Sequence, residues 1–268
     1  LGAIVLDEAQ HIKNPKTQNA QAAFSLPARR RFVLTGTPME NSVRDLWSLM
    51  NFVAPGYLGN RADFRERYEK PLMERVAATS PVSTVQRRLA RRLRPFFLRR
   101  RKADVARELP EKIEQVVPCE LAPTQRATYN AFLREIQQGL GAGQASDGAR
   151  RMKMLTGLLR LRQVCCDLRL LGLPPNEPAD PSAKLDLLDE LLEEIIDGGH
   201  RVLVFSQFVK MLDLIKERLV ATGTNYCYLA GLTKNRQQEV DRFQNDTIPV
   251  FLVSLKAGGV GLNLSAAD

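Results

Sequence analysis

The sequence contains few of the residues that build metal sites and disulfide frameworks. Its 268 residues include four cysteines and two histidines, and no cysteines have the spacing of a CxxC pair. We therefore expect no zinc site, and we predict that the cysteines are reduced core thiols of a cytosolic or nuclear protein. They are Cys119, Cys165, Cys166 and Cys227.

Long hydrophobic runs are also missing. Hydrophobic residues make up 44% of the chain and charged residues 26%, which is typical of ordinary globular proteins. No apolar run approaches the roughly 20 residues that span a bilayer, so we expect no membrane-spanning helix. The chain is long enough to bury a sizeable core and to form two modest domains.

Negative charge is in the minority. The sequence has 39 Lys and Arg against 30 Asp and Glu, which gives a net charge of +9. This balance predicts a polyanionic partner, most simply nucleic acid, although it says nothing about specificity. Nine basic residues and no acidic ones lie between Arg87 and Lys102. Two interpretations of this run stay open, a solvated face and a surface that contacts phosphates.

Two carboxylates follow the first apolar segment. Residues 3–6 are apolar and run directly into Asp7 and Glu8, which is typical of a buried parallel strand that ends at a charged edge. Ligands of open parallel sheets bind at that edge. One carboxylate can hold Mg²⁺ while the other orients or deprotonates an attacking water, as phosphoryl transfer requires. The alternative is that Asp7 only caps the following helix.

A second strand is expected at residues 31–35, after a short helix. The strand, helix and strand form a β-α-β unit, so Thr35, Gly36 and Thr37 should lie at the same edge as the carboxylates. Hydroxyl groups in such a loop can respond to a phosphate. The alternative is an ordinary turn in which Thr37 or Asn41 caps the next helix.

The remaining chain divides into a helical middle and an alternating last third. Helical spacing covers most of residues 61–164, with an edge strand at residues 112–119 and a flexible glycine-rich loop at residues 139–148. Strands at residues 202–205, 226–229 and 250–253 alternate with helices, two of them capped by Ser182 and Thr233, which predicts a parallel sheet covered on both faces.

The loops after these strands combine polar side chains with glycine. Residues 254–264 hold glycines and one lysine at a strand end, where exposed backbone N–H groups can approach phosphate oxygens. An ordinary glycine-rich turn is the alternative.

Residues 4–14 and 34–42 closely resemble the second and third motifs of SWI/SNF-type ATPases, a branch of the superfamily 2 helicase-like motors. The resemblance continues through residues 45–52, and residues 202–208 and 254–264 look like the fourth and fifth motifs. Members of this family are double-stranded-DNA translocases built from two RecA-like lobes.

The resemblance implies roles for the motif residues. Asp7 would hold Mg²⁺ and Glu8 would be the catalytic base that acts on ATP. The residues that couple nucleotide state to DNA grip would be Gln10, His11, Thr35, Gly36, Thr37, Gly261 and Asn263. The DNA-binding residues would be Ser206, Gln207, Lys234, Arg236, Ser254, Lys256, Gly258 and Gly259.

The fold that the resemblance implies is α/β, with two RecA-like parallel-sheet lobes, the first one incomplete, and helical insertions. Residues 1–108 would form the C-terminal part of the first lobe with a helical protrusion. Residues 109–181 would supply the linker, an entry strand and a helical insertion, and residues 182–268 a truncated second lobe. Because the first lobe of the family ends near Phe96 and Phe97, we expect both rings to be buried.

Two parts of the family's site are missing from the sequence. No GxxxxGK[ST] phosphate-binding loop is present, and the family's sixth-motif arginines would lie after Asp268. Without these groups phosphoryl transfer loses orders of magnitude in rate. We therefore expect an internal fragment of an ATPase that hydrolyses little ATP alone.

The sequence thus predicts part of an ATP-dependent translocase or remodeller that uses ATP and Mg²⁺. The expected partners are duplex DNA and protein bound to that DNA, with no membrane and a monomeric state. The expected location is cytoplasmic, at the nucleoid, in a bacterium and nuclear in a eukaryote. Two alternatives remain, namely an RNA helicase or restriction-type translocase of the same superfamily, and a non-catalytic nucleic-acid-binding module.

Overall fold

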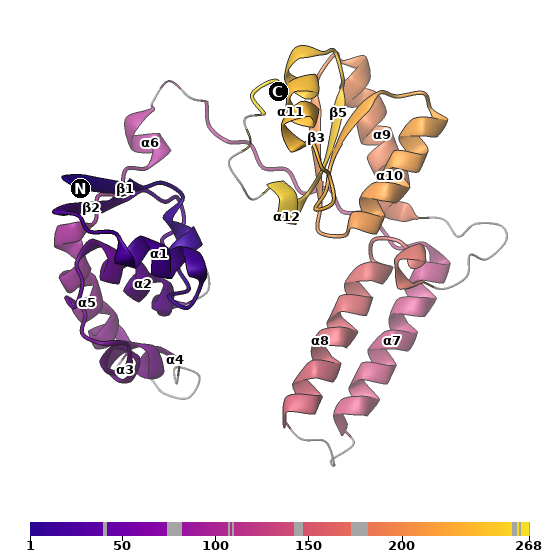
Figure 1. Ribbon diagram of the computed structural model, residues 1–268. Coiled ribbons are helices and arrows are strands. Elements are labelled where there is room, and N and C mark those ends of the chain that lie inside the picture. Colours follow the sequence, from indigo (N-terminus) through magenta and orange to yellow (C-terminus); the bar gives the residue numbers. More distant parts are fainter. Residues whose placement is uncertain are drawn as a thin grey trace. The chain divides into compact units, whose positions relative to one another are not determined.

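The computed structural model describes residues 1–39, 42–73, 82–106, 108, 110–141, 147–172, 182–258, 262 and 264–267. The chain divides into two compact units, Leu1–Lys112 and Ile113–Asp268. Each unit has its own parallel sheet, with two strands in the first unit and three in the second (Figure 1). The predicted fold class, α/β with two separate parallel sheets and helical insertions, is confirmed.

The first unit begins with the predicted β-α-β unit. Strands β1 (Ala3–Leu6) and β2 (Arg30–Val33) are parallel neighbours, and helix α1 (Gln18–Ser25) connects them. The Thr17 hydroxyl caps α1 by accepting a hydrogen bond from the Ala20 amide at 3.3 Å. Because the two strands run in the same direction, the segments that follow them leave from the same edge of the sheet.

One face of this sheet is covered and the other is not. Ile4, Leu6 and Val33 pack against a cluster formed by α1 and by helix α2 (Val43–Val53). Val5 and Phe32 point to the opposite face and are 57% and 51% exposed. The prediction of a buried strand is therefore wrong for Ala3 and Val5, because helices cover only one face of this sheet in the part of the chain that the structure describes.

Helices form the rest of the first unit. They are α3 (Arg61–Phe64), the π-helical turn η2 (Arg65–Glu69), α4 (Lys70–Met73), α5 (Val82–Leu93) and α6 (Lys102–Val105). Phe64, Tyr68 and Leu89 form a second core with α2. Trp47, the single tryptophan of the sequence, lies in this core and donates a hydrogen bond to the Gly59 carbonyl at 3.1 Å.

One local expectation for the first unit, and one part of an alternative, are wrong. Phe96 and Phe97 are 42% and 43% exposed, because the chain leaves α5 at this point and only the Phe96 ring packs, against Tyr57 at 4.7 Å between centroids. The cap of α2 is Ser42, whose hydroxyl accepts a hydrogen bond from the Arg44 amide at 3.1 Å. Thr37 lies too far before the helix to serve as its cap, and Asn41 lies outside the described residues.

A long helical hairpin opens the second unit. Helices α7 (Pro123–Gly141) and α8 (Asp147–Val164) lie side by side (Figure 1). A Cβ at Gly157 of α8 would lie 2.5 Å from Ile136 Cγ1, so the absence of a side chain permits this close packing. The Gln125 side chain, which is fully buried, donates to the Val164 carbonyl at 2.9 Å and joins the base of the hairpin together.

The sheet of the second unit has the strand order β3-β5-β4, with all three strands parallel. The strands are β3 (Val202–Ser206), β4 (Tyr226–Leu229) and β5 (Val250–Ser254). Helices α9 (Ala183–Asp197) and α10 (Val209–Ala221) cover one face, and α11 (Arg236–Asn245) covers the other (Figure 1). Every residue of the central strand β5 is buried, as expected for a sheet covered on both faces.

Three predictions for this unit differ from the structure. Residues 112–119 pair with no described strand, and Ile113 and Val116 are about nine-tenths exposed, so apolar alternation there did not produce an edge strand. Thr233 closes the turn before α11 and does not cap the helix, which begins after Asn235. Ser182 occupies the position before α9, but its hydroxyl donates to the Cys166 carbonyl at 3.0 Å.

All four cysteines are free thiols, and Cys227 is buried. Within the described ranges, the helices are all either too short or too polar to cross a membrane.

Candidate functional site

The two carboxylates lie directly after β1, at the edge predicted from the sequence. Asp7 and Glu8 are both exposed, and the chain turns at Glu8 into a 3₁₀ helix, Ala9–Ile12. Glu8 adopts left-handed backbone angles, with φ 48° and ψ 45°. Among the described residues it is the single non-glycine with a positive φ. Such a conformation costs free energy in an ordinary residue and is most frequent at functional sites.

A chain of hydrogen bonds joins Glu8 to the second strand. Gln10 Nε2 donates to Glu8 Oε2 at 2.6 Å, and Gln10 Oε1 accepts from the Thr35 hydroxyl at 2.9 Å. The Thr35 oxygen in turn accepts from the Thr37 amide at 3.1 Å. The Gln10 side chain therefore connects the Thr35–Thr37 loop to the Glu8 carboxylate through hydrogen bonds.

The backbone on both sides of this chain is fixed. The Leu34 amide donates to the Leu6 carbonyl at 2.8 Å, and the Ala9 amide donates to the Leu34 carbonyl at 3.0 Å, so the two strand ends continue to pair beyond the sheet. The fully buried Ser48 hydroxyl of α2 donates to the Ile12 carbonyl at 2.5 Å, which holds the end of the 3₁₀ helix. These contacts determine where the two carboxylates can lie.

The donor set at this edge suits a hard cation. Asp7 uses one oxygen, Oδ1, to accept from the Glu8 amide at 2.8 Å. Within the described part of the chain, no three His, Cys, Asp or Glu residues are grouped so as to form a metal cage. Mg²⁺ needs no such cage, because it is usually held by one or two carboxylates together with water and substrate phosphates. The residues present therefore fit Mg²⁺.

The other two residues of the first unit that were predicted to couple nucleotide state to DNA grip, His11 and Gly36, are both exposed. His11 is exposed, and its amide donates to the Glu8 carbonyl at 3.1 Å, so its described contact is made by the backbone. Gly36 is exposed, with no heavy atom within 4 Å of the place where a Cβ would lie.

The second unit places two of the predicted DNA-binding serines side by side. Ser206 at the end of β3 is in register with Ser254 at the end of β5. The Ser206 hydroxyl accepts from the Phe208 amide at 3.1 Å, and the Ser254 hydroxyl accepts from the Ala257 amide at 3.3 Å. Each serine therefore shapes the loop that follows its strand, at the carboxyl edge of the sheet.

Gly258 has a steric reason to be glycine. It ends the short helix α12 (Leu255–Gly258), and a Cβ there would lie 3.0 Å from Val253 Cγ1 and 3.2 Å from Phe205 Cε1. The backbone thus approaches the sheet more closely than a larger residue would allow. Lys256 in the same turn is exposed, so its ammonium group is available to an anion.

The basic residues after β4 lie at the same edge because all three strands are parallel. The Thr233 hydroxyl accepts from the Ala230 amide at 3.0 Å and closes the turn that presents Lys234 and Arg236. Lys234 is exposed and Arg236, the first residue of α11, is half-buried. Gly259, Gly261 and Asn263 were also predicted to belong to the site, but they lie outside the described residues.

Sequence reasoning missed two residues that position the site. Arg162 of α8 donates to Gln207 Oε1, so it orients a predicted DNA-binding side chain. The two residues line a groove of about 980 Å³ between α8, α9 and β3. Ser48 supports the acidic edge from α2, as described above. A single arginine in a basic helix and a serine in an apolar helix carry no signal of such long-range contacts.

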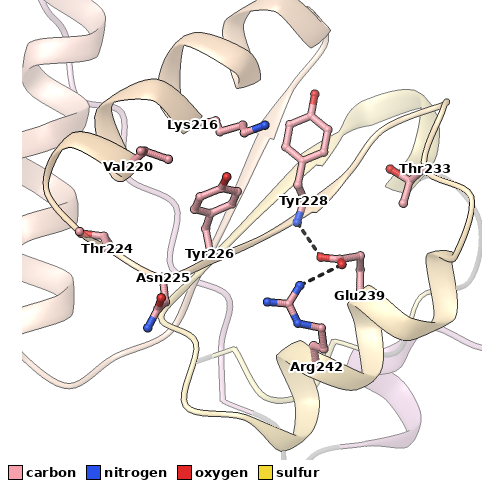
Figure 2. A pocket seen from close by; sticks show the side chains of 10 residues that line it. Lys216, Val220, Thr224, Asn225, Tyr226, Tyr228, Thr233, Glu239 and Arg242 are labelled. Carbon is pink, nitrogen blue, oxygen red and sulfur yellow. Dashed lines mark hydrogen bonds and ion pairs between the residues drawn. The ribbon is translucent and has the colours of Figure 1, made fainter.

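A separate pocket of about 610 Å³ lies along the edge strand β4 (Figure 2). Glu239 accepts from the Tyr228 amide at 3.1 Å and is held by Arg242 at 3.0 Å, so a side chain satisfies the free edge of the sheet. Burial, together with a hydrogen bond to Asp213, raises the pKa of Tyr228. None of the predicted site residues lines this pocket, although Thr233, next to Lys234, does.

Comparison with known families supports the motif assignment. Residues 1–170 match the model of the SNF2-related domain, and residues 183–268 match the model of the helicase conserved C-terminal domain. Together these matches include both candidate edges, the acidic one after β1 and the polar one after β3 and β5.

Individual relatives and solved structures agree with these matches. The chain is 34% identical over 270 residues to a Mycoplasma pneumoniae "Uncharacterized ATP-dependent helicase", covering 99% of this chain and 24% of that protein. It is 32% identical over 285 residues to the human "SWI/SNF-related matrix-associated actin-dependent regulator of chromatin subfamily A member 1", covering 99% and 26%.

Among solved structures, the chain resembles the "Sulfolobus solfataricus SWI2/SNF2 ATPase core in complex with dsDNA", with 33% identity and a TM-score of 0.52. The match covers 99% of this chain and 56% of that one. The chain thus spans about a quarter of the length of the curated relatives that it matches. On the strength of the matched domains, the chain belongs to the SNF2-related, SWI/SNF-type ATPase family.

Proposed function

We propose that this chain is part of an ATP-dependent double-stranded-DNA translocase or remodeller, which couples ATP hydrolysis to movement on DNA. The observation that carries the proposal is the hydrogen-bond chain from Glu8 through Gln10 to Thr35. It joins a strained carboxylate, suited to act on water, to a loop of a neighbouring strand that can respond to a phosphate.

In this proposal the first unit supplies the hydrolytic carboxylates. Glu8 accepts a proton from the attacking water, and Gln10 Nε2 donates to its carboxylate at 2.6 Å. Asp7 would hold Mg²⁺, which would supply positive charge to neutralise the phosphates of ATP. Gln10 and Thr35 couple the presence of the γ-phosphate to the rest of the unit. His11, Gly36 and Thr37 lie in the same loops and take part in this coupling.

The second unit would track the DNA backbone. Its polar edge combines hydroxyl groups (Ser206 and Ser254), the Gln207 amide and exposed cations (Lys234 and Lys256), and such groups bind phosphates without reading bases. Arg236 and Gly258 extend this edge. By the family resemblance, Gly259 would also bind DNA, and Gly261 and Asn263 would couple nucleotide state to DNA grip. Binding is then tolerant of sequence and weakens steeply with salt.

The proposed organisation follows from these roles. Residues 1–108 are the C-terminal part of the first ATPase lobe with its helical protrusion. Residues 109–181 supply the linker and the helical insertion of the second lobe, and residues 182–268 are the rest of that truncated lobe. The relative described as bound to double-stranded DNA supports duplex DNA over RNA as the partner. Protein bound to that DNA is the proposed object of remodelling, with the motor acting as a monomer where the DNA lies, at the nucleoid or in the nucleus.

ATP hydrolysis with and without duplex DNA tests the proposal. The 268-residue chain and a version extended at both ends should be compared in the same assay. Because the sequence has no phosphate-binding loop, we expect turnover only from the extended version, stimulated by duplex DNA and much less by RNA. Equal turnover by the two versions contradicts the assignment of roles, and stimulation by RNA alone favours the helicase alternative.

A variant of the extended version separates a motor from a binding module. Glu8→Gln should abolish turnover while DNA binding persists, because it removes the base and leaves the polar edge of the second unit unchanged. If the variant retains the biological activity of the parent, the non-catalytic binding module is the correct interpretation.

A further inference from the structure

Strand β4 is the outer strand of the second sheet. In the described part of the chain the strand order is β3-β5-β4, so β5 is the single strand that pairs with it. The four residues Tyr226–Leu229 span about 13 Å, at about 3.3 Å per residue. The pocket of about 610 Å³ runs along the outer side of this strand, between helices α10 and α11 (Figure 2). An unpaired strand edge is a template on which another chain can pair.

The outward backbone groups of β4 belong to its two tyrosines. The Tyr228 N–H points away from β5, since it donates to Glu239 Oε2 at 3.1 Å. Tyr226 lies two residues earlier in the strand, so its N–H and C=O turn to the same outer side. The Tyr228 N–H has a partner there, whereas no described residue bonds the outward backbone groups of Tyr226. One half of the edge is therefore capped and the other half is open.

Two cations flank the strand, one on each helix. Arg242 of α11 donates to Glu239 Oε1 at 3.0 Å, so the carboxylate that caps the Tyr228 amide also pairs with a guanidinium. Lys216 of α10 lies against the Tyr228 ring, with its Nζ 6.0 Å from the ring centre (Figure 2). Lys216 is exposed, and in the part of the unit that the structure describes no carboxylate forms an ion pair with it. The pocket thus combines open backbone groups with a cation that has no counter-ion.

Glu239 indicates which chemical group the capped half of the edge selects. Its two oxygens bond a backbone amide and a guanidinium at the same time, which is the pair of contacts that an acidic residue next to β4 would make. Helix α11 is held in the core by Val240 and Phe243, so Glu239 can leave the Tyr228 amide by a change of rotamer without movement of the helix. One hydrogen bond changes an equilibrium constant by about 2–12-fold, so this cap is weak enough to be displaced.

We propose that the outer edge of β4 is a docking site for an extended acidic segment of a partner protein, which pairs with the strand and places carboxylates beside Lys216 and Arg242. An extended peptide fits because its backbone both donates to and accepts from the outward groups of Tyr226. A nucleic-acid backbone fits less well, because its phosphates have no N–H group to donate to the Tyr226 carbonyl. The inference does not depend on ATP hydrolysis and goes beyond the proposed function.

Peptide binding to the 268-residue chain tests the inference. The probe is a fluorescein-labelled heptapeptide in which glutamate and valine alternate, and fluorescence anisotropy measures its binding. The same peptide with lysine in place of glutamate should bind about 10-fold more weakly, because attraction to the two cations becomes repulsion. Two further peptides carry N-methyl groups either on the glutamates or on the valines. One of them should lose binding and the other should keep it, because only one edge of the peptide strand faces β4.

Variants of the chain test the two charged positions. Lys216→Gln should weaken binding of the glutamate peptide by about 2–5-fold, whereas Lys210→Gln, at an exposed position of the same helix outside the pocket, should not. Glu239→Ala removes the cap and should tighten binding by about 2–12-fold. Asp241→Ala controls for the gain of positive charge, because it removes an exposed carboxylate of the same helix outside the pocket. Circular dichroism in urea reports whether each variant is folded, and the peptide comparisons need no variant.

Four outcomes overturn the inference, and all of them leave the proposed function standing. The first is no binding of the glutamate peptide to wild type or to Glu239→Ala at about 1 mM. The second is equal binding of the lysine peptide or of both N-methylated peptides, which removes the charge preference or the strand pairing. The third is dimerisation of Glu239→Ala that the peptide does not reverse, which assigns the edge to a second copy. The fourth is binding to the 268-residue chain and not to the version extended at both ends, which assigns the edge to another segment of the longer protein.

Discussion

The left-handed backbone at Glu8 gives a prediction that stability measurements can test without any substrate. Replacing Glu8 by alanine keeps the strain and removes the side chain, whereas replacing it by glycine removes both. In the left-handed region a Cβ costs roughly 1–2 kcal/mol. Compared with alanine, glycine lowers the free energy of unfolding by about 0.4–1 kcal/mol, because it gives the unfolded chain greater conformational freedom. The difference between these two ranges is about 0–1.6 kcal/mol, so we expect Glu8→Gly to be more stable than Glu8→Ala by about 0.8 kcal/mol, the mid-range value.

Asp7 provides the matched control, since its φ is not positive. There only the unfolded-chain effect acts, so Asp7→Ala should be more stable than Asp7→Gly by about 0.4–1 kcal/mol. The order of the two substitutions thus reverses between neighbouring residues.

Urea unfolding followed by Trp47 fluorescence is the assay. Trp47 is the single tryptophan of the sequence and is buried in the first unit, so its signal reports the unfolding of that unit alone. If alanine is more stable than glycine at both positions, Glu8 is not strained, and the argument that its carboxylate is held in a costly orientation fails.

Three further predictions concern the second unit. Gln125→Leu leaves the Val164 carbonyl and the Ala183 amide without their buried partner, so it should lower the free energy of unfolding by about 2–4 kcal/mol in urea titrations. The control Gln138→Leu, at an exposed position, should change the free energy of unfolding by less than about 0.5 kcal/mol. Gly157→Ala should destabilise the hairpin by up to about 2 kcal/mol, because overpacking against Ile136 exceeds the gain in helix propensity. The control Gly139→Ala should be stabilising, because no atom lies within 4 Å of the position of its Cβ. A higher melting temperature for Gly157→Ala than for Gly139→Ala would contradict the close packing. Burial raises the pKa of Cys227 to about 11 from its ordinary value of 9.0, so between these pH values the folded unit keeps a proton that the unfolded chain loses. The stability that this group contributes is complete below pH 9 and is lost as the pH rises to about 11. In unfolding followed by circular dichroism, Cys227→Ala should therefore lack this part of the decrease in stability with pH.

The strands and the site edges were predictable from sequence because they depend on local patterns. The apolar run before Asp7 and the polar residue after each later strand determined which loops share an edge, and parallel pairing then placed Ser206 beside Ser254. These features follow from strand direction alone and need no knowledge of packing.

Features that depend on distant partners were not predictable. Phe96 and Phe97 are exposed because few described residues of the first unit follow α5 and could pack against them. Residues 112–119 alternate in polarity, but no described strand pairs with them. The left-handed angle of Glu8 is also invisible in the sequence, since nothing marks a glutamate for that conformation. Long-range contacts such as Arg162 with Gln207 arise only after the helices pack.

The central claim is that the acidic edge after β1 hydrolyses ATP in response to DNA. The most direct measurement is ATP turnover by the extended protein with saturating duplex DNA, compared between wild type, Glu8→Gln and the exposed control Glu190→Gln. Removal of a general base costs about 10²–10⁴-fold in rate, so we expect a loss of at least about 100-fold for Glu8→Gln and none for the control. Turnover by Glu8→Gln within a factor of about three of wild type would contradict the account.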